Sequence, residues 1–558
     1  MANDIIPAGL SKSKRDALIA NADAELLATL GYKQEFKREF SRLEVFGIAF
    51  SIMGVAPSIA ATLTYAMPCG GPLSMVWSWL VASFFIALTG LALGDLASSM
   101  PTSGGLYFWT FSLCPKYCRR LTCWLVGYAN TLSTTSAVAS IDWGCAQMIL
   151  AAASITTDGA FSASNWQVLL TYYAVLLCHA CITSIGTRAL ARLQTFAITL
   201  NAALAAAVII SLCTATPGEY RNSAKYALTG WYNVSGYTGG GAFLLSMLMA
   251  AWTIASYDSC VHISEEASNA ATAVPLGIFA SIVLAALIGM GILISITFNM
   301  GTNLDAIINS SVGQPMATIF LNSLGKEGCL AIWTFVIITQ FFMGASMSLA
   351  SSRQVFAFSR DGALPFSGWI YKINNYTLTP VNPAWFSTLI SALLGLLGLI
   401  NEAAVSAIFA LSVIGAAIAY FIPIFLRLIG PKENFKPGPW YLGDFWSPVI
   451  GWVSCAYLIF ISVILCMPSA LPAVAEDMNY ASLVTGAVFI FALVWYYIPH
   501  YGGSNWFTGP KSNIDDDSIP NINEREEGEV HSVGSDKDQI KQQTQFVEVQ
   551  KYDTRELE

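Results

Sequence analysis

The chain is 558 residues long, and 55% of its residues are apolar while only 11% are charged, whereas an ordinary soluble domain has about 25% charged residues. This composition excludes most classes of soluble protein and favours a membrane protein. The formal net charge of −8 and the lack of a basic patch with interleaved aromatics exclude a nucleic-acid partner.

Charged residues concentrate at the two ends of the chain. Residues 1–43 carry 13 of them and residues 511–558 carry 19, which leaves 30 for the residues between. We therefore expect an N-terminal tail at 1–43, a membrane-embedded domain at 44–500 and a C-terminal tail at 501–558. The C-terminal tail is rich in Asp, Glu, Ser, Gln and Lys. This composition predicts a largely disordered segment, because it buries too little apolar surface to offset the loss of chain entropy.

Apolar runs separated by charged residues, Pro or Gly predict twelve membrane-spanning helices. They cover residues 44–66, 72–95, 121–150, 167–186, 193–215, 242–257, 275–298, 329–351, 382–400, 404–425, 447–467 and 480–499. An even number of spans places both tails on one side of the membrane. The short loops on that side hold eleven Lys and Arg against three in the other loops, which predicts cytoplasmic termini. On the outer side, the sequons at Asn233 and Asn309 are candidate glycosylation sites.

The sequence carries no pattern typical of an enzyme or of a cofactor protein. The twelve Cys are scattered, many of them inside apolar runs, and imply no disulfide framework. Cys260, His262 and the two Glu that follow are of metal-binding type, but no second His accompanies them, and we expect no metal site. Gly325-Lys326 does not complete a phosphate-binding loop. We therefore expect no cofactor and no enzymatic activity.

Two of the predicted spans carry polar interruptions at mid-depth. The first contains Gly54 and Pro57; Gly permits close approach of a ligand and Pro removes a backbone donor. The sixth follows three glycines and reads Trp252-Thr-Ile-Ala-Ser-Tyr-Asp258. Breaks in spans one and six are expected of two inverted five-helix repeats with a zwitterionic substrate at the midplane. The alternative is chance, since Gly and Pro are common in membrane helices.

Ionisable residues inside or beside these spans are candidates for proton coupling. Asp142 lies well inside the third span, and Asp258 and His262 follow the sixth span four residues apart, so that they share one helix face. These three residues are our proton-coupling candidates. The alternative for Asp142 is an acid near a helix end that reaches the membrane surface. We expect Glu266 to be a solvated cap and His179 to be a core histidine with a satisfied ring.

Several strings between residues 27 and 500 occur in the order and at the spacing of one transporter family. They are Gly31-Tyr-Lys-Gln-Glu-Phe-Lys-Arg38, Phe46-Gly-Ile-Ala-Phe-Ser-Ile-Met-Gly54, Ala97-Ser-Ser-Met-Pro101-Thr-Ser-Gly104-Gly105-Leu-Tyr107, Ser140-Ile-Asp142, Ala191-Arg-Leu-Gln194, Trp252-Thr-Ile-Ala-Ser-Tyr-Asp-Ser-Cys-Val-His262, Ser264-Glu-Glu266 and Ser352-Arg-Gln-Val-Phe-Ala-Phe-Ser-Arg360-Asp-Gly. Together they resemble the fungal GABA permeases of the amino acid/choline transporter family. The resemblance implies an all-α membrane protein with twelve transmembrane helices, in a leucine-transporter-type fold of two inverted five-helix repeats plus two helices.

The resemblance also implies a substrate site. In similar proteins, the broken first helix holds the substrate carboxylate and amine through main-chain groups, which fall here on Ile52, Gly54, Val55 and Ala56. The matching stretch of the sixth helix supplies an aromatic lid and further main-chain contacts, which fall on Trp252, Thr253, Ile254 and Ala255. An acid that matches Asp258 takes part in proton coupling in some relatives.

The chain departs from the pattern of its relatives in three places. Its first break reads Gly54-Val55-Ala56, where the superfamily often has Gly-Ser-Gly character, so different contacts are expected there. Span 193–215 has Asn201 as its main polar residue and lacks the Lys that several proton-coupled relatives carry in the fifth helix. Coupling through such a Lys is therefore excluded. Asp95 stands where these permeases often have Glu, and we expect a structural role for it.

We therefore expect a secondary active transporter that imports GABA or another small amino acid by alternating access, driven by protons. Its partners are that substrate, protons and the lipid bilayer, and its expected location is the plasma membrane, with the vacuolar membrane as the alternative. A second candidate substrate class is choline, a polyamine or a thiamine-like cation, for which Trp143, Trp252 and Tyr257 would supply rings and Asp142 charge. A third candidate function is a nutrient sensor that signals through its cytoplasmic tails with little flux.

Overall fold

The computed structural model describes most of the chain. The described residues are 12–35, 38, 40–185, 187–374, 376–377, 379–400, 402–474 and 478–511. The predicted C-terminal tail beyond residue 511 and the start of the predicted N-terminal tail lie outside them. In the described part, the regular structure is helical apart from two isolated β-bridges, which join Phe40 to Ala267 and Cys69 to Asn233.

Ten helices of the described chain are long and apolar enough to cross a membrane. Their elements are α3 (Arg42–Met53) with α4 (Val55–Ala66), α5 (Gly71–Ser99), α7 (Arg119–Thr156), α8 (Asn165–Thr183), α9 (Thr187–Ala215), α14 (Ala270–Asn299), α16 (Pro315–Arg360), α18 (Val381–Gly395) with η3 (Leu396–Leu399), α19 (Glu402–Ile429) and α20 (Gly443–Ile464). The shorter apolar helices α11 (Gly239–Leu245), α12 (Leu248–Thr253) and α21 (Ala481–Tyr497) lie where the sixth and twelfth spans are predicted. The all-helical fold is thus confirmed for the described residues, and the arrangement of twelve spans in two inverted repeats stays a prediction.

Further helices precede, connect or follow these elements. They are α2 (Lys12–Thr29), α6 (Gly105–Leu113), η1 (Gly218–Tyr220), α10 (Ala224–Thr229), α13 (Ser259–His262), η2 (Ser264–Glu266), α15 (Leu304–Ile308), α17 (Ser367–Ile370), η4 (Lys432–Asn434) and α22 (Gly503–Trp506). Near its start, α16 bends at Gly325, which has φ 70° and ψ 179°. Such a backbone conformation is accessible to glycine and to few other residues.

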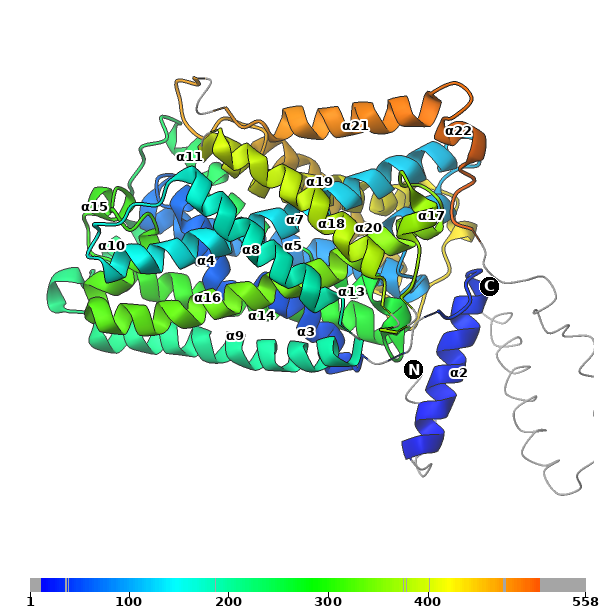
Figure 1. Ribbon diagram of the computed structural model, residues 1–558, viewed down its shortest axis with the longest axis horizontal. Coiled ribbons are helices and arrows are strands. Elements are labelled where there is room, and N and C mark those ends of the chain that lie inside the picture. The colour runs from blue at the N-terminus through cyan, green and yellow to red at the C-terminus, as the bar shows by residue number, and fades with distance from the viewer. Residues whose placement is uncertain are drawn as a thin grey trace, which may run out of the picture. The chain divides into compact units, whose positions relative to one another are not determined.

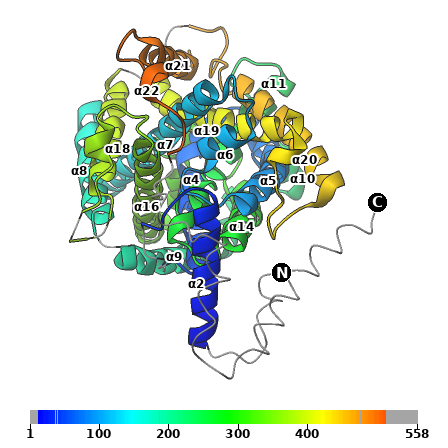
Figure 2. The same ribbon diagram turned by 90° about the vertical axis from the view of Figure 1, so that its right-hand side faces the viewer.

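The helix α7 runs through the middle of the described bundle. It packs against both α16 and α19, and Figures 1 and 2 show it between other helices in both views. Hydroxyl groups along α7 donate to carbonyl oxygens one turn back: Thr131 to Gly127 at 2.9 Å and Thr135 to Thr131 at 2.7 Å. These bonds satisfy the hydroxyl groups where no bulk water is available.

Glycines let α5 and α14 pack closely along each other. Trp79 of α5 lies against Gly289 of α14, where a Cβ would collide with the indole ring. The Trp79 Nε1 donates to the Ala286 carbonyl oxygen at 3.0 Å. In the other direction, Gly90 of α5 leaves room for Ile282 of α14. Small residues at such contacts allow the close backbone approach that membrane helices use in place of a hydrophobic driving force.

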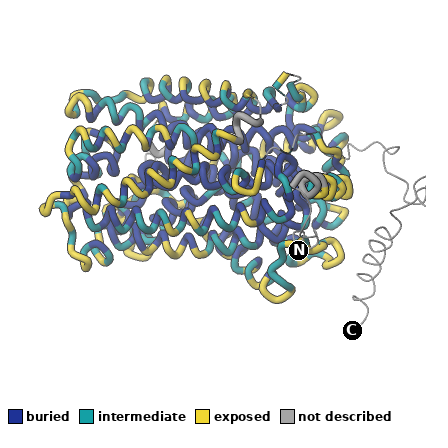
Figure 3. Tube along the Cα trace, turned by 90° about the horizontal axis from the view of Figure 1, so that it is seen from below, coloured by how far each residue is buried: buried dark blue, intermediate teal, exposed yellow. Residues whose placement is uncertain are grey.

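Large apolar side chains cover the outside of the bundle. Figure 3 shows exposed positions recurring along the outer helices, while the trace between them is buried. The exposed apolar side chains include Ile210 of α9, Leu287 of α14, Val463 of α20 and Leu483 of α21. An apolar surface of this extent is unfavourable in water and favourable in lipid.

The segment after α2 and the last described residue, Lys511, meet at Asp361, directly after α16. Tyr32 Oη donates to Asp361 Oδ2 at 3.4 Å, and the Lys511 main-chain N–H donates to Oδ1 at 3.0 Å. Tyr107 Oη also donates to Oδ2, at 2.7 Å. Burial raises the pKa of Asp361 to about 6, although the neighbouring Arg360 guanidinium lowers it. We call this end of the bundle, where Tyr32 and Lys511 lie, the tail end.

Candidate functional site

The first membrane helix is interrupted at Gly54, where the sequence predicts a break. Gly54 lies between α3 and α4 with φ 40° and ψ 59°, a left-handed conformation that favours glycine. Ser58 supports the break, because its Oγ donates to the Met53 carbonyl oxygen at 2.6 Å. The side chain of Met343 in α16 packs against the turn, and a Cβ on Gly54 would lie 2.8 Å from its Sδ.

A second interruption separates α12 from α13. The helix α12 ends at Thr253, and Ile254 follows with φ −95° and ψ 51°. Ser256 has φ 55°, and residues 254–258 are not helical. The break predicted in the sixth span is therefore present, and it exposes main-chain groups at the end of α12.

The two interrupted regions are neighbours, because α12 packs against α4. Trp252, near the end of α12, donates from Nε1 to Ser140 Oγ of α7 at 3.2 Å, and its ring centroid lies 4.8 Å from that of Phe409 in α19. The fold thus brings both sets of predicted substrate-site residues to adjoining elements. The buried ones are Ile52, Gly54, Val55, Ala56, Trp252, Thr253 and Ile254, and Ala255 is half-buried.

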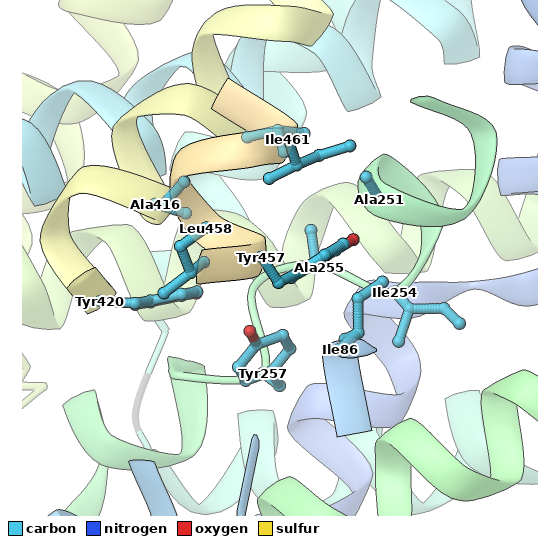
Figure 4. Close-up of a pocket in the computed structure, with 12 residues that line it drawn as sticks. Ile86, Ala251, Ile254, Ala255, Tyr257, Ala416, Tyr420, Tyr457, Leu458 and Ile461 are labelled. Carbon is cyan, nitrogen blue, oxygen red and sulfur yellow. The ribbon is translucent and has the colours of Figure 1, made fainter. Parts of the chain in front are cut away.

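A small cavity lies beside the second interruption (Figure 4). Ile254 and Ala255 line it together with Tyr257, Tyr420 and Tyr457. Its other lining residues are Ile86, Ala251, Val413, Ala416, Ala417, Leu458 and Ile461. The residues predicted in the first interruption do not line this cavity, so the cavity is adjacent to only one half of the candidate site.

Two hydroxyl groups flank the interruptions: that of Ser51, a residue that sequence reasoning missed, and that of Thr253, which was predicted to bind substrate through its main chain alone. Ser51 lies near the end of α3, and Thr253 ends α12. Ser51 Oγ and Thr253 Oγ1 are buried and have no hydrogen-bond partner among the described residues. Buried hydroxyl groups are normally paired, so these two are available to a polar ligand. The Ser51-Ile-Met-Gly54 string contained the signal for Ser51, because a Ser precedes the break.

Asp258 and His262 contact each other, as their spacing predicts. His262 Nε2 lies 3.3 Å from Asp258 Oδ2 and 3.2 Å from Asn130 Nδ2. Tyr420 Oη donates to Asp258 Oδ1 at 2.7 Å, and His262 Nδ1 lies 3.1 Å from the Ser103 carbonyl oxygen. Each polar side-chain atom of this pair therefore has a partner within the described part of the chain.

Asp142 pairs with His179 of α8. The His179 Nδ1 lies 3.0 Å from Asp142 Oδ2, and both side chains are completely buried. The alternative of an acid that reaches the membrane surface is therefore wrong. His179 is a core residue as expected, but its ring is not satisfied, because Nε2 has no partner among the described residues. A sequence separation of 37 residues gave no signal of the contact.

Glu266 is buried, and the prediction of a solvated cap is wrong. Its Oε1 lies 2.8 Å from Arg353 Nε, and Glu265 Oε2 lies 3.0 Å from Arg360 Nη1. A buried carboxylate requires such a partner, and the two arginines supply it from the last turns of α16. These ion pairs tie the segment after α13 to α16 at the tail end.

Within the described residues, no group of three or more His, Cys, Asp or Glu is placed to hold a metal ion.

The two candidate glycosylation sites differ in accessibility. Asn309 is exposed, whereas Asn233 is half-buried. The Asn233 Nδ2 donates to the Tyr237 carbonyl oxygen at 2.8 Å, and its Oδ1 accepts from Ser235 Oγ at 2.7 Å. A glycan on Asn233 would have to replace the first of these bonds, so Asn309 is the more accessible acceptor, and glycosylation of both stays a prediction.

Known proteins with similar sequences are amino-acid permeases. The family model for amino acid permeases matches residues 40–490. The GABA-specific permease of Saccharomyces cerevisiae is 38% identical over 506 residues, which are 90% of this chain and 88% of that protein. An uncharacterized amino-acid permease of Schizosaccharomyces pombe is 38% identical over 519 residues, 91% of this chain and 93% of that one.

A plant protein extends the comparison beyond fungi. An amino-acid permease of Arabidopsis thaliana is 33% identical over 504 residues, which are 88% of this chain and 96% of that protein. These relatives are permeases and not enzymes, and the ten long apolar helices agree with a place in the membrane. The chain therefore belongs to the amino acid permease family and is an integral membrane protein.

Proposed function

We propose that the protein imports GABA or another small amino acid by alternating access and that protons drive the import. The specificity of the Saccharomyces cerevisiae relative, a GABA-specific permease by name, supports GABA as the substrate. The proposed fold has twelve spans, in two inverted five-helix repeats plus two helices. The proposed location is the plasma membrane, with the vacuolar membrane as the alternative. The proposal also places the tail end in the cytoplasm. The contacts of Tyr32 and Lys511 with Asp361 support termini on one side.

The observation that carries the proposal is the contact between two interrupted membrane helices. A zwitterionic substrate needs donors for its carboxylate and acceptors for its ammonium group. The N-terminus of α4 presents N–H groups that favour an anion, and the C-terminus of α12 presents carbonyl groups that favour a cation. Because α4 and α12 pack together, both kinds of group are available in one region, as in other transporters with broken helices.

Specific residues take specific roles in this proposal. Main-chain groups of Ile52, Gly54, Val55, Ala56, Thr253, Ile254 and Ala255 bind the substrate. The unpaired hydroxyl groups of Ser51 and Thr253 add side-chain hydrogen bonds, which are strongest where water is excluded. Trp252 forms the aromatic lid, and its contacts with Ser140 and Phe409 set the position of its ring.

Buried ionisable groups provide the coupling to protons. Asp142, Asp258 and His262 are the candidates, and all three are buried. A charge inside the membrane is costly, so such residues bind protons or partners and mark coupling pathways. Each elementary charge that crosses the membrane contributes about 2.3 kcal/mol per 100 mV, which is enough to drive accumulation of a neutral zwitterion.

The alternative of an organic-cation substrate gains no support from the aromatic contacts. Trp143 packs on Tyr172, with ring centroids 5.5 Å apart, and Tyr257 packs on Tyr420 at 5.2 Å. Trp252 packs on Phe409 instead. Among the described residues, the rings of Trp143, Trp252 and Tyr257 thus pack on three different partners and not on one another.

Uptake in yeast cells that lack their own GABA permeases tests the proposal. Labelled GABA is supplied at pH 5 and pH 7.5, with and without a protonophore, and chased with unlabelled amino acids, choline and putrescine. We expect saturable uptake that is faster at pH 5, collapses with the protonophore and is displaced by amino acids. No GABA flux from protein at the cell surface, or displacement by choline or putrescine alone, would contradict the substrate assignment.

A truncated chain separates transport from sensing. Removal of residues 512–558 leaves every described residue in place, so a transporter should keep its GABA flux. A variant that loses a growth or signalling response while the full chain shows little flux would favour the sensor.

A further inference from the structure

One buried ionisable pair in the membrane-spanning part has unused hydrogen-bonding atoms. We call Asp142 and His179 the α7–α8 pair. A single contact joins them, from Nδ1 to Oδ2 at 3.0 Å, and both side chains are 0% exposed. Asp142 Oδ1 and His179 Nε2 have no hydrogen-bond partner among the described residues. Buried polar atoms are normally paired. Two atoms without a hydrogen-bond partner in one buried pair therefore indicate that the pair has a function.

The surroundings of the α7–α8 pair supply no compensating positive charge. Asp142 interacts electrostatically with Cys145 and Tyr172, and neither is a cation. From α16, Gly344 lies against both side chains of the pair, and the Phe341 ring centroid lies 4.4 Å from that of the imidazole. Within the described chain, no Lys or Arg forms an ion pair with Asp142. The charge of the pair therefore depends on its own protons.

The Asp258–His262 pair offers a contrast. Its four polar side-chain atoms are engaged by each other and by Tyr420, Asn130 and Ser103. Because the Ser103 carbonyl oxygen accepts from Nδ1–H of His262, a proton gained at Nε2 replaces the bond from Asn130 with one to Asp258 and finds no open position. This arrangement suits a brace that holds the second interruption in shape.

We propose that the α7–α8 pair binds the coupled proton, an inference that rests on the proposed function. The short contact between Asp142 and His179 holds one proton, and in that state the pair carries one net negative charge. A second proton from water forms a new bond at His179 Nε2 or Asp142 Oδ1 and makes the pair neutral. The neutral form is favoured while the pair is buried, and the proton returns to water when the site hydrates.

The α7–α8 pair also contacts both walls of the candidate site through its neighbours. Ser140, two residues before the aspartate, accepts the hydrogen bond from Trp252. Gln340 Nε2 of α16 donates to the Ile141 carbonyl oxygen at 2.9 Å. Met343, next to the glycine that contacts the pair, packs against the first interruption. A change in the charge of the pair thus acts on α7 and α16, which hold the lid and the first break.

Reconstituted full-length protein tests this assignment. Liposomes report two activities: accumulation of labelled GABA driven by an inward proton gradient, and GABA/GABA exchange without a gradient. The variant D142N/H179Q replaces the pair by two amides that can share a neutral hydrogen bond, so the buried contact is retained without a titratable group. We expect the ratio of gradient-driven accumulation to exchange to fall at least about tenfold, which corresponds to about 1.4 kcal/mol of coupling.

Matched variants and a second readout complete the test. Asp158 is an exposed aspartate that pairs with Lys326, so Asp158→Asn should leave the ratio unchanged. Should D142N/H179Q exchange too slowly to give a ratio, a pH indicator on purified protein measures proton uptake on GABA binding. Loss of that proton uptake in D142N, in H179Q or in the double variant supports the assignment.

Each remaining outcome has one meaning. Wild-type proton coupling that persists in D142N/H179Q overturns the assignment and leaves the proposed function standing. A wild-type protein that exchanges GABA but does not accumulate it under a proton gradient refutes proton coupling and the assignment together. A wild-type protein without GABA exchange refutes the proposed substrate instead.

Discussion

Gly54 is the residue whose backbone most directly shapes the candidate site. Its φ of 40° turns the chain between α3 and α4, and Met343 occupies the space that a side chain would need. An L-residue forced into this conformation costs about 1–2 kcal/mol. Glycine is therefore the residue that both the backbone and the packing require at this break.

The Gly54→Ala substitution should reduce uptake of labelled GABA about tenfold, because about 1.4 kcal/mol of strain corresponds to a factor of ten in an equilibrium. Uptake per molecule at the cell surface is the measurement. Gly486→Ala in α21 is the matched control, since no heavy atom lies within 4 Å of the added Cβ, and it should transport normally. Equal uptake by both variants would show that the break does not depend on this conformation.

The buried ion pairs at the tail end are expected to stabilise the folded protein. Arg353→Met leaves the Glu266 carboxylate buried without its partner, and such a loss costs about 3–5 kcal/mol. We expect a clearly lower unfolding temperature of the purified protein in detergent and partial recovery in R353M/E266Q. Lys326→Met breaks the exposed pair with Asp158 and should change stability by less than about 1 kcal/mol. Similar effects of R353M and K326M would argue against a structural role of the buried pair.

Spacing along one helix made some of these residues predictable. Asp258 and His262 lie four positions apart and meet as expected. Glu266 and Arg353 are 87 positions apart, so no local pattern pairs them, and the expectation of a solvated acid is wrong. A residue's charge is visible in a sequence, whereas its partner is visible only after the helices have packed.

At the level of helices, the first break was predictable because Gly54 acts on the local backbone. The second break lies at residues 254–258, which contain no Gly or Pro, and the three glycines before it begin α11 instead. The ends of the helices were less predictable. The predicted span 329–351 is part of α16, which continues to Arg360. Its last turns are buried within the protein, and ion pairs with Glu265 and Glu266 make the polar residues Arg353 and Arg360 acceptable there.

Helix packing between α5 and α14 gives a prediction at this scale. Gly289→Ala places a methyl group against the Trp79 indole ring, and overpacking of this kind costs about 1–3 kcal/mol. Thermal unfolding in detergent should show a lower midpoint for G289A, and W79F/G289A should recover part of the loss. An unchanged midpoint in G289A would mean that α5 and α14 can separate without penalty.

For the whole molecule, the tail end joins segments from the beginning, the middle and the end of the described chain. Tyr32, Tyr107 and the Lys511 main chain all donate to the Asp361 carboxylate. The predicted tails at 1–43 and 501–558 are therefore not simply solvated, because residues 32 and 511 are part of this packing. Composition marked them as polar and could not show which residues return to the bundle.

The Asp361 carboxyl predicts how stability depends on pH. Burial raises its pKa from 3.8 to about 6, so the folded protein binds this proton more tightly than the unfolded chain. The buried negative charge is unfavourable above about pH 6, and this penalty is removed as pH falls from 6 towards 3.8. The group contributes at most about 1.4 kcal/mol per pH unit over that window.

The comparison of wild type with Asp361→Asn isolates this contribution. Unfolding temperatures in detergent at several pH values between 7.5 and 4.5 give the difference between the two proteins. We expect wild type to gain stability relative to D361N as pH falls below about 6. A gain in the opposite direction, or a constant difference, would show that Asp361 stays charged across this range.

The most direct measurement is an experimental structure of the purified protein with GABA bound. The proposed function predicts ligand density between the two interruptions, with the carboxylate at the main chain of Gly54–Ala56, the ammonium group at the main chain of Thr253–Ala255, and Trp252 over the ligand. Density elsewhere, such as in the cavity lined by Tyr257, Tyr420 and Tyr457 without contact to Gly54, would contradict it.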